Sequence, residues 1–255
     1  MQLLNLFCLK MSTNYINWLD TLSQNTKSSS PVKQMQGAHK LLERLSSPTI
    51  LPQVIDLFAR PENIGRIREN PNGFVTFPLA SSTDNRLDLT LHVFDPVNGP
   101  NTYPEYRKEA MHYHFFHLTS KTLLGKIKHF FWKPCHKNDP AAVARERYNF
   151  SRELVGTPYT ITHKGRSYLK QAKSKEVPAG QGFYMPNRVI HNADYPLNQP
   201  TVTLVLRTNL NPISADAFLT SRQVVQNIQA GGQSAKISNH DAKDLIKSTL
   251  AQLDS

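Results

Sequence analysis

Hydrophobic and polar positions follow three successive patterns along the chain, and the first pattern is helical. Apolar side chains recur at helical spacing, most clearly between Val32 and Leu45. Ser30 and Pro31 are residue types that begin a helix, because a serine caps the first turn and proline is tolerated at the first helical position. This pattern predicts an N-terminal helical flank over residues 1–72.

From Gly73 the pattern changes to the period of two that is typical of strands. The segment 87–94 alternates strictly between apolar and polar residues, and further strand-like segments follow as far as Arg207, interrupted by a loop over 134–144. No internal repeat is visible. The sequence therefore predicts a mainly β protein, with a single small antiparallel barrel over residues 73–210.

Helical spacing returns in the last part of the chain. Ser214 is a candidate N-cap, Phe218 and Ile228 lie near one face, and a last helix is predicted over 241–253. We therefore expect a C-terminal helical flank over residues 211–255. We further expect both flanks to pack outside the barrel and to supply no metal ligand.

Composition changes this picture in one respect, which is charge. The 255 residues can bury one substantial core, and the formal net charge is +11. Between Lys121 and Lys175 there are 13 Lys or Arg against 3 Asp or Glu. These cations alternate with apolar positions, as on solvated strand faces, and no nucleic-acid-binding motif accompanies them. We therefore expect small anionic metabolites as partners, and neither nucleic acid nor membrane.

The two cysteines bear on the compartment. Cys8 and Cys135 form no disulfide framework, and neither has a neighbour at metal-ligand spacing. The apolar start is too short for the core of a signal peptide, and no segment is long and apolar enough to cross a membrane. The prediction is a cytoplasmic protein.

Three histidines carry the candidate chemistry. His112 and His114 are two residues apart on a strand, so their side chains project from one face. His191 follows a turn-rich approach that begins at Gly180 and ends with Pro186. Three neutral imidazoles on one side of an ion leave positions open for a substrate. The pattern predicts a metal site with His112, His114 and His191 as its ligands.

These residues resemble the two motifs of the cupin superfamily. The first motif has a leading glycine, a His-x-His pair, a glutamate and a second glycine. His112, His114 and Gly125 are in register with it, whereas Leu118 stands at the glutamate and Tyr106 at the leading glycine. Leu118 therefore excludes an acidic fourth ligand at that position.

The second cupin motif has the better match. Gly180, Pro186 and His191 are in register, while Arg188 replaces a glycine and Tyr195 replaces an asparagine. The resemblance covers roughly residues 74 to 210. It implies a double-stranded β-helix, or jelly roll, around the metal site.

Among cupins, a site of three histidines without glutamate is similar to the cysteine dioxygenase group, whose iron(II) binds sulfur and dioxygen. That group carries a Ser-x-His-x-Tyr run on the strand after the third histidine. Here Thr203, Val205 and Arg207 stand on the corresponding face. Arg207 would instead hold a carboxylate or sulfonate, and either Phe183 or Tyr184 is expected to line the pocket.

The leading hypothesis is a non-haem iron(II) dioxygenase that acts on a small anionic substrate, with a thiol or amino acid as the first type to test. Its partners would be that substrate and dioxygen, and Arg207 and Tyr184 would be its catalytic residues. Manganese, nickel and zinc stay open as metals. The alternatives are a non-catalytic metal- or metabolite-binding cupin and a zinc, manganese or nickel isomerase or lyase. A homodimer through exposed strand edges is a further expectation.

Three further residues keep open roles. His117 is out of phase with the His-x-His pair, so it joins the site only if a bulge turns it inward. His92 lies on the polar face of its strand and is a candidate for indirect contact with the metal. Arg188 can point to solvent or over the pocket.

Overall fold

The structure is a computed structural model, and most of the predicted β region is described. The described residues are 17–25, 30–58, 66–70, 73–95, 111–151, 160–208, 214–220, 235–236 and 239–253. Cys8, Tyr106 and Ile228, which the sequence analysis singled out, lie outside them.

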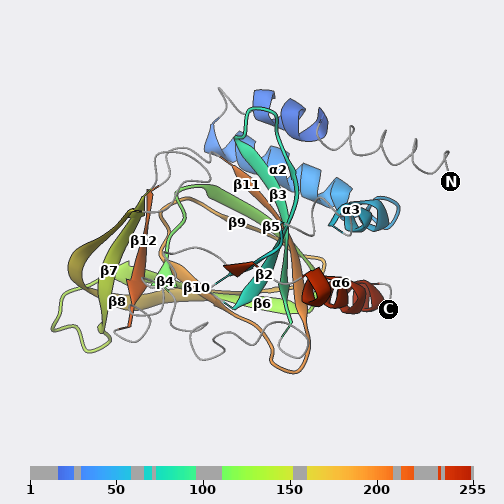
Figure 1. Cartoon of the computed structure of the whole chain (residues 1–255). Coiled ribbons are helices and arrows are strands. Elements are labelled where there is room, and N and C mark those ends of the chain that lie inside the picture. The colour runs from blue at the N-terminus through green and yellow to red at the C-terminus, as the bar shows by residue number, and fades with distance from the viewer. Residues whose placement is uncertain are drawn as a thin grey trace.

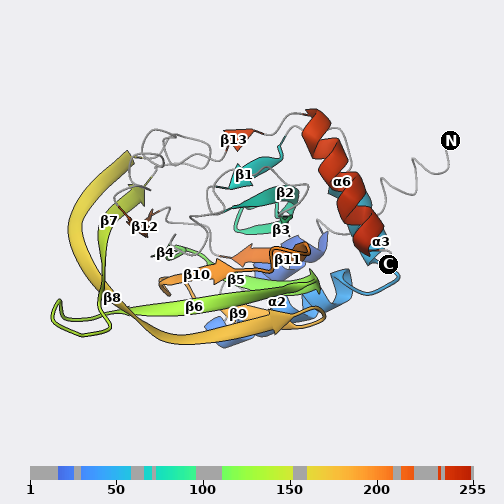
Figure 2. The same cartoon turned by 90° about the horizontal axis from the view of Figure 1, so that it is seen from below.

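Strands are divided between two antiparallel sheets (Figures 1 and 2). One sheet, called the open sheet below, has seven strands in the order β13-β1-β2-β3-β11-β5-β9. Its strands are β1 (Arg68–Asn70), β2 (Phe74–Ser81), β3 (Leu87–Phe94), β5 (His117–Leu124), β9 (Gly182–Met185), β11 (Thr201–Thr208) and β13 (Ala235–Lys236).

The other sheet, called the closed sheet below, joins six strands in the ring β10-β4-β12-β7-β8-β6. These are β4 (Met111–His112), β6 (Lys126–Pro134), β7 (Val143–Ser151), β8 (Thr160–Pro178), β10 (His191–Asp194) and β12 (Ser214–Leu219). The ring closes because β6 pairs with both β8 and β10. The prediction of a mainly β, antiparallel protein is confirmed.

Helices cover the outer face of the open sheet, away from the closed sheet (Figure 1). They are α2 (Pro31–Leu45), α3 (Leu51–Phe58) and α6 (Asn239–Leu253), with a further helical stretch over residues 17–25. Their apolar side chains form one buried core with β2, β3 and β11. The helices expected at both ends are therefore present.

Strand β3 shows how the alternation in the sequence places the two faces of the open sheet. Leu87, Leu89 and Leu91 are buried in the core under the helices. Because side chains alternate across a strand, the polar positions between them face the other sheet. His92 on that face lines a cavity between the sheets. His92, left open above as a candidate for indirect contact with the metal, thus faces the cavity.

Helix α2 begins where the residue types predict. The Ser30 side chain accepts a hydrogen bond from the backbone N–H of Lys33 at 3.5 Å, and Pro31 is the first helical residue. Ala38 and Leu42 are buried against the sheet, and an ion pair between Glu43 and Lys121 ties the helix to β5.

Two short segments are strands where the pattern predicts helix. Ser214–Leu219 forms β12, which pairs with β7 and β4, so a helix beginning at Ser214 is wrong. The reason is tertiary: Asp216 accepts hydrogen bonds from Arg147 and Asn149 of β7, and such pairing overrides the weak helical preference of a short segment. Similarly, Arg68–Asn70 pairs with β2. The domain boundaries at 72 and 210 remain predictions.

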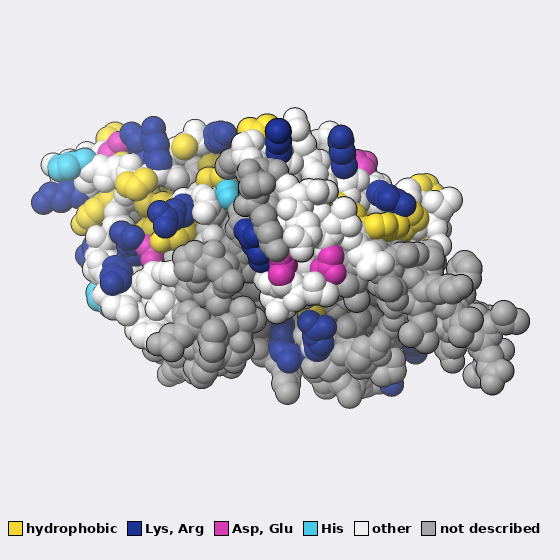
Figure 3. Space-filling view, turned by 90° about the horizontal axis from the view of Figure 1, so that it is seen from above, with side chains coloured by type: hydrophobic (Ala, Val, Ile, Leu, Met, Phe, Trp, Pro, Cys, Tyr) yellow, Lys and Arg dark blue, Asp and Glu magenta, His cyan; other side chains and the backbone are white. Residues whose placement is uncertain are grey.

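Cationic side chains are spread over the surface. In the view of Figure 3 the Lys and Arg side chains are scattered among uncharged ones. Several have acidic partners: Lys126 pairs with Glu176, and Lys170 pairs with Asp139. Within the described part of the chain, no helix has both the length and the apolarity to cross a membrane.

Candidate metal site

The three predicted ligands come together in the closed sheet. His112 ends β4, His114 follows two residues later, and His191 begins β10 directly opposite His112 in the strand register. The ring centroids of His112 and His191 are 4.5 Å apart, and those of His114 lie 4.8 Å from His112 and 4.9 Å from His191. The predicted convergence is thus present, and we call these residues the three-histidine cluster.

The cluster has the spacing of a site that could hold a metal ion. One nitrogen from each ring lies within 4.8 Å of the others. Three nitrogens bound on one side of an ion at about 2.1 Å are about 3.0–3.4 Å apart. The widest pair would therefore have to close by more than about 1 Å, through side-chain rotation and small shifts of the backbone. Among the described residues, no other group of three or more His, Cys, Asp or Glu side chains has this spacing.

Desolvation keeps two of these imidazoles, those of His114 and His191, in the neutral form that binds metals. Desolvation, followed by repulsion from the neighbouring rings and from Arg207, holds the pKa of His114 well below its ordinary value of 6.5. The pKa of His191 is also well below 6.5, first through burial and then through His112 and His129. A neutral imidazole has a free lone pair, so no proton must leave before an ion binds.

Backbone contacts orient two of the ligands. Nδ1 of His191 lies 3.2 Å from the carbonyl oxygen of Val189, so an Nδ1–H donated there leaves Nε2 to face the cluster. The N–H of Arg188 donates to the carbonyl of His114 at 2.8 Å. Arg188 has a φ of 61°, in the left-handed region, and its side chain is exposed. The structure thus places it toward solvent, at a turn position where cupins carry glycine.

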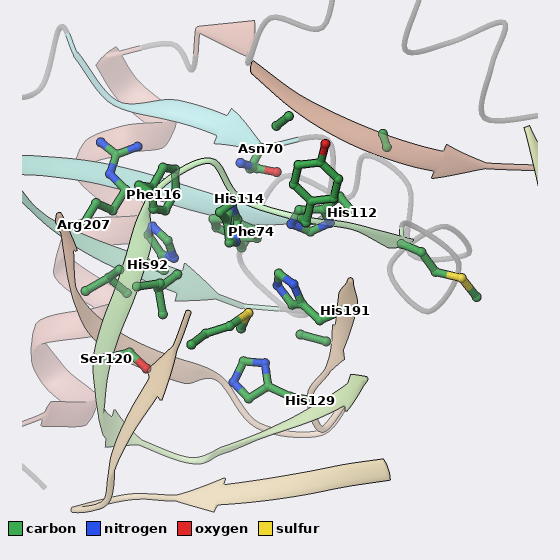
Figure 4. Close-up of a pocket in the computed structure, with 18 of the residues that line it drawn as sticks. Asn70, Phe74, His92, His112, His114, Phe116, Ser120, His129, His191 and Arg207 are labelled. Atoms are coloured by element: carbon green, nitrogen blue, oxygen red, sulfur yellow. The ribbon is translucent and has the colours of Figure 1, made fainter. Parts of the chain in front are cut away.

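The cluster borders a cavity of about 360 Å³ between the two sheets (Figure 4). Both sheets contribute apolar lining residues, which include Phe94, Phe116, Leu118, Ile127, Met185 and Val205. The polar lining residues include Thr76, His92, Ser120, His129, Thr203 and Asp216. Leu118, which the resemblance to the first cupin motif aligns with a glutamate, is therefore part of an apolar wall.

Arg207 lines the cavity as predicted from strand parity, together with Thr203 and Val205. Its Nη2 lies 2.9 Å from Oδ2 of Asp88, its cross-strand neighbour on β3. The hypothesis assigned the balancing anion to a substrate, because a guanidinium cannot lose its charge. The protein supplies that anion itself, so this reason for an anionic substrate is withdrawn.

Arg207 also touches the cluster through an aromatic ring. Its guanidinium carbon lies 5.5 Å from the centroid of the Phe116 ring. Phe116 in turn stacks on His114, with centroids 4.5 Å apart and planes at 20°. Figure 4 shows the three side chains side by side at one end of the cavity. The ion pair with Asp88 therefore helps to fix the ring that packs against a candidate ligand.

Tyr184 and Phe183 do not line the cavity, contrary to the sequence analysis. The Tyr184 hydroxyl lies 2.8 Å from Nδ1 of His117, and the two rings stack on the other face of β5 and β9. Tyr184 is cross-strand to Thr119, whereas the cavity residues Leu118 and Ser120 project from the opposite face. Tyr184 is thus placed away from any ligand in the cavity, and His117 points away from the cluster, as expected.

His129 is the cavity residue that the sequence analysis missed. It lies on β6 between Ile127 and Phe131, which share its inward face by strand parity. Its ring stacks on Phe183, with centroids 4.4 Å apart and planes at 15°. The alternation of these three residues was the available signal. It was overlooked because the neighbouring lysines made the segment look like an exposed strand.

The stability of the protein should depend on pH, because two histidines outside the cluster have lowered pKa values. Burial, and then Arg207, lowers the pKa of His92 to about 3. Burial, and then Lys175, lowers that of His129 to about 4. In the unfolded chain both return toward 6.5. As pH falls below that value, the unfolded state binds more protons than the folded state, so the free energy of unfolding falls.

We expect the metal-free protein to lose on the order of 3 kcal/mol from His129 alone between about pH 7 and pH 4. The contribution is fully present above the unfolded pKa and is lost as pH falls toward the folded one. Urea unfolding across this range measures the loss. His129→Leu should lose less than the wild-type protein, and an equal loss in both would contradict the assignment.

Comparisons with known proteins add the following. No family model matches the chain, and no curated protein matches it. Similar solved structures include an RmlC-like cupin from Shewanella frigidimarina NCIMB 400, which is 14% identical, with 61% of this chain and 92% of that chain covered and a TM-score of 0.31. The polyketide cyclase RemF from Streptomyces resistomycificus is 14% identical, with 69% and 87% covered and a TM-score of 0.36.

KdgF from Halomonas sp. is 10% identical, with 56% of this chain and 84% of that chain covered and a TM-score of 0.30. Cupin-like proteins are thus among the structural neighbours of this chain. At these identities and TM-scores the likeness carries no statement about activity, which has to be argued from the site.

Proposed function

We propose that this protein is a metal-dependent oxygenase in which His112, His114 and His191 hold iron(II) beside the substrate cavity. The observation that carries the proposal is the donor set: the imidazoles of buried His191 and of half-buried His112 and His114 converge at the edge of a cavity large enough for a small molecule. Desolvation also holds the pKa values of His114 and His191 well below 6.5. Bound there, iron(II) would supply the redox chemistry that dioxygen requires.

The charges around the cluster bear on the substrate. Three neutral ligands leave a divalent ion with its full formal charge. The carboxylate that lines the cavity, Asp216, accepts hydrogen bonds from Arg147 at 2.5 Å and from Asn149 at 2.7 Å. The site therefore favours a substrate that brings its own anionic donor, such as a thiolate or a carboxylate.

The apolar side chains of the cavity wall keep water away from the candidate metal site. Phe116, Leu118 and Val205 line the cavity with side chains that cannot hydrogen-bond to water. Exclusion of water strengthens electrostatic interactions at the site and protects reactive species from side reactions. Phe116, held between Arg207 and His114, also restricts the rotation of a candidate ligand.

A second candidate function is a zinc, manganese or nickel isomerase or lyase. His92 and His129 favour it, because they place two neutral imidazoles in the same cavity. Burial lowers their pKa values to about 3 and about 4, so each is a weak base and would accept a proton only from a substrate that the bound metal has made more acidic. In such an enzyme the metal would polarise the substrate and an imidazole would act as the base.

Oxygen uptake by the reconstituted protein distinguishes these functions. We expect the iron(II)-loaded protein, prepared anaerobically, to consume dioxygen with at least one member of a panel of thiols and amino acids. The zinc-loaded protein and the His114→Ala variant are the controls, and neither should consume oxygen. Tight metal binding without oxygen uptake on the whole panel would instead favour the isomerase or a binding protein.

A further inference from the structure

His129 is buried in the cavity without a hydrogen-bond partner. Its side chain is 6% exposed, and neither Nδ1 nor Nε2 has a partner among the described residues. A buried polar group that makes no hydrogen bond costs about 1–3 kcal/mol. An apolar ring would fill this position without that cost, so the two nitrogens require an explanation.

The surroundings of His129 hold the ring in place without using its nitrogens. Phe183 stacks on one face, with Lys175 over the Phe183 ring at 5.3 Å. Stacking fixes the plane of the imidazole, while its edge, which carries both nitrogens, stays free for another group. Figure 4 shows the side chains of His129 and His191 pointing into the same cavity.

The position of His129 relative to the cluster matters for what it could contact. Its ring centroid lies 6.2 Å from that of His191, and the metal-ligand group does not include it. It is therefore too far to be a fourth ligand of the same ion, yet one small molecule can reach both. A neutral imidazole offers such a molecule one donor and one acceptor.

Charges in the described part of the cavity narrow the chemistry of that molecule. Arg207 is paired with Asp88, and Asp216 is paired with Arg147. The polar groups without a charge, such as Ser120 and Thr203, line the wall. A second anionic group on the ligand would have to compete with Asp88 for Arg207, whose buried Nε has no hydrogen-bond partner among the described residues. A hydroxyl, carbonyl or amide would instead find neutral hydrogen-bonding partners.

From this arrangement we infer that His129 contacts the substrate. Its imidazole hydrogen-bonds a neutral hydroxyl, carbonyl or amide group of a small molecule whose anionic end binds at the three-histidine cluster. The inference rests on the metal site of the proposed function. The inference adds a substrate class to that proposal. We expect the site to bind monoanions that carry a neutral polar group a few bonds from the metal-binding atom, in preference to dianions or purely apolar acids.

Two acids of equal size test this inference. β-Hydroxypropionate and butyrate each bring one carboxylate, and only the first carries a hydroxyl in place of a methyl group. We titrate both into the cobalt(II)-loaded protein and follow the visible absorption of the metal. The wild-type protein should bind the hydroxy acid about tenfold more tightly, which is the effect of one hydrogen bond to a buried polar group.

The variant His129→Leu should lose this preference, since it keeps an apolar contact with Phe183 and has no polar atom. His129→Gln, which keeps a donor and an acceptor, should retain part of it and guards against a folding defect in the first variant. Lys128→Gln, on the same strand with its side chain exposed, should behave as wild type. Azide, which reaches only the metal, should bind all of these proteins equally.

Two results would overturn the inference while the metal site stands. One is a wild-type protein that binds azide but shows no preference for the hydroxy acid. The other is a preference that survives in His129→Leu, which would mean that ordered water or the metal itself satisfies the hydroxyl. A protein that retains no metal and binds no azide would instead refute the proposed function.

Discussion

Replacing His114 by alanine should abolish stoichiometric metal binding while the fold is retained. The reason is that His114 supplies one of three imidazoles that lie within 4.8 Å of one another, and its removal leaves two ligands in the described part of the site. Loss of groups that merely orient a ligand lowers metal affinity about 10–100-fold, so we expect more than about 100-fold from loss of a ligand itself. Metal analysis after dialysis measures the stoichiometry, and far-ultraviolet circular dichroism reports the fold.

His117→Ala is the matched control. His117 is three residues further along the chain, but its Nδ1 lies 2.8 Å from the Tyr184 hydroxyl on the other face of the sheet. This variant should therefore bind metal as the wild-type protein does. Equal metal content in His114→Ala and the wild type would show that the three-histidine cluster is not the metal site.

Replacing Gly125 by alanine should cause a large loss of stability. Gly125 joins β5 of the open sheet to β6 of the closed sheet with a φ of +68°. A Cβ there would lie 2.5 Å from the carbonyl oxygen of Pro200 and 2.7 Å from Oγ1 of Thr201. Strain of the left-handed backbone and the steric conflict together should cost about 3 kcal/mol or more.

Gly165→Ala separates the two causes. Gly165 also has a positive φ, of +84°, but a Cβ there would meet nothing within 4 Å. This variant should therefore lose only the backbone contribution of about 1–2 kcal/mol. Urea unfolding of both variants gives the two values, and equal losses would mean that the close approach of Pro200 to Gly125 is unimportant.

Local signals in the sequence predicted those elements whose causes are themselves local. Helix α2 begins at Pro31 after a Ser30 cap because capping involves residues three apart, which the sequence displays directly. The inward face of β11 follows from strand parity in the same way. Parity accounts for the His-x-His pair only in part, because β4 ends at His112 and His114 lies in the loop after it.

Features that depend on pairing between distant segments could not be predicted in this way. Asp88 and Arg207 are 119 positions apart, and only the register of β3 against β11 makes them neighbours. Likewise, β12 is a strand because it pairs with β7 and β4, which are distant in the sequence. Tyr184 was expected in the pocket, but β9 and β10 belong to different sheets although only a turn separates them, and no local pattern in the sequence reveals this.

The three-histidine cluster is carried by the closed sheet and the loop after β4, whereas Thr76, His92 and Thr203 line the cavity from the open sheet. The residues that would bind the ion thus lie outside the sheet that supplies much of the cavity wall that a ligand would contact. Combinatorial libraries at these three wall positions could accordingly explore new ligand shapes, with retained metal content as an internal check that each variant is still intact. Such a separation makes the protein a candidate scaffold for directed evolution.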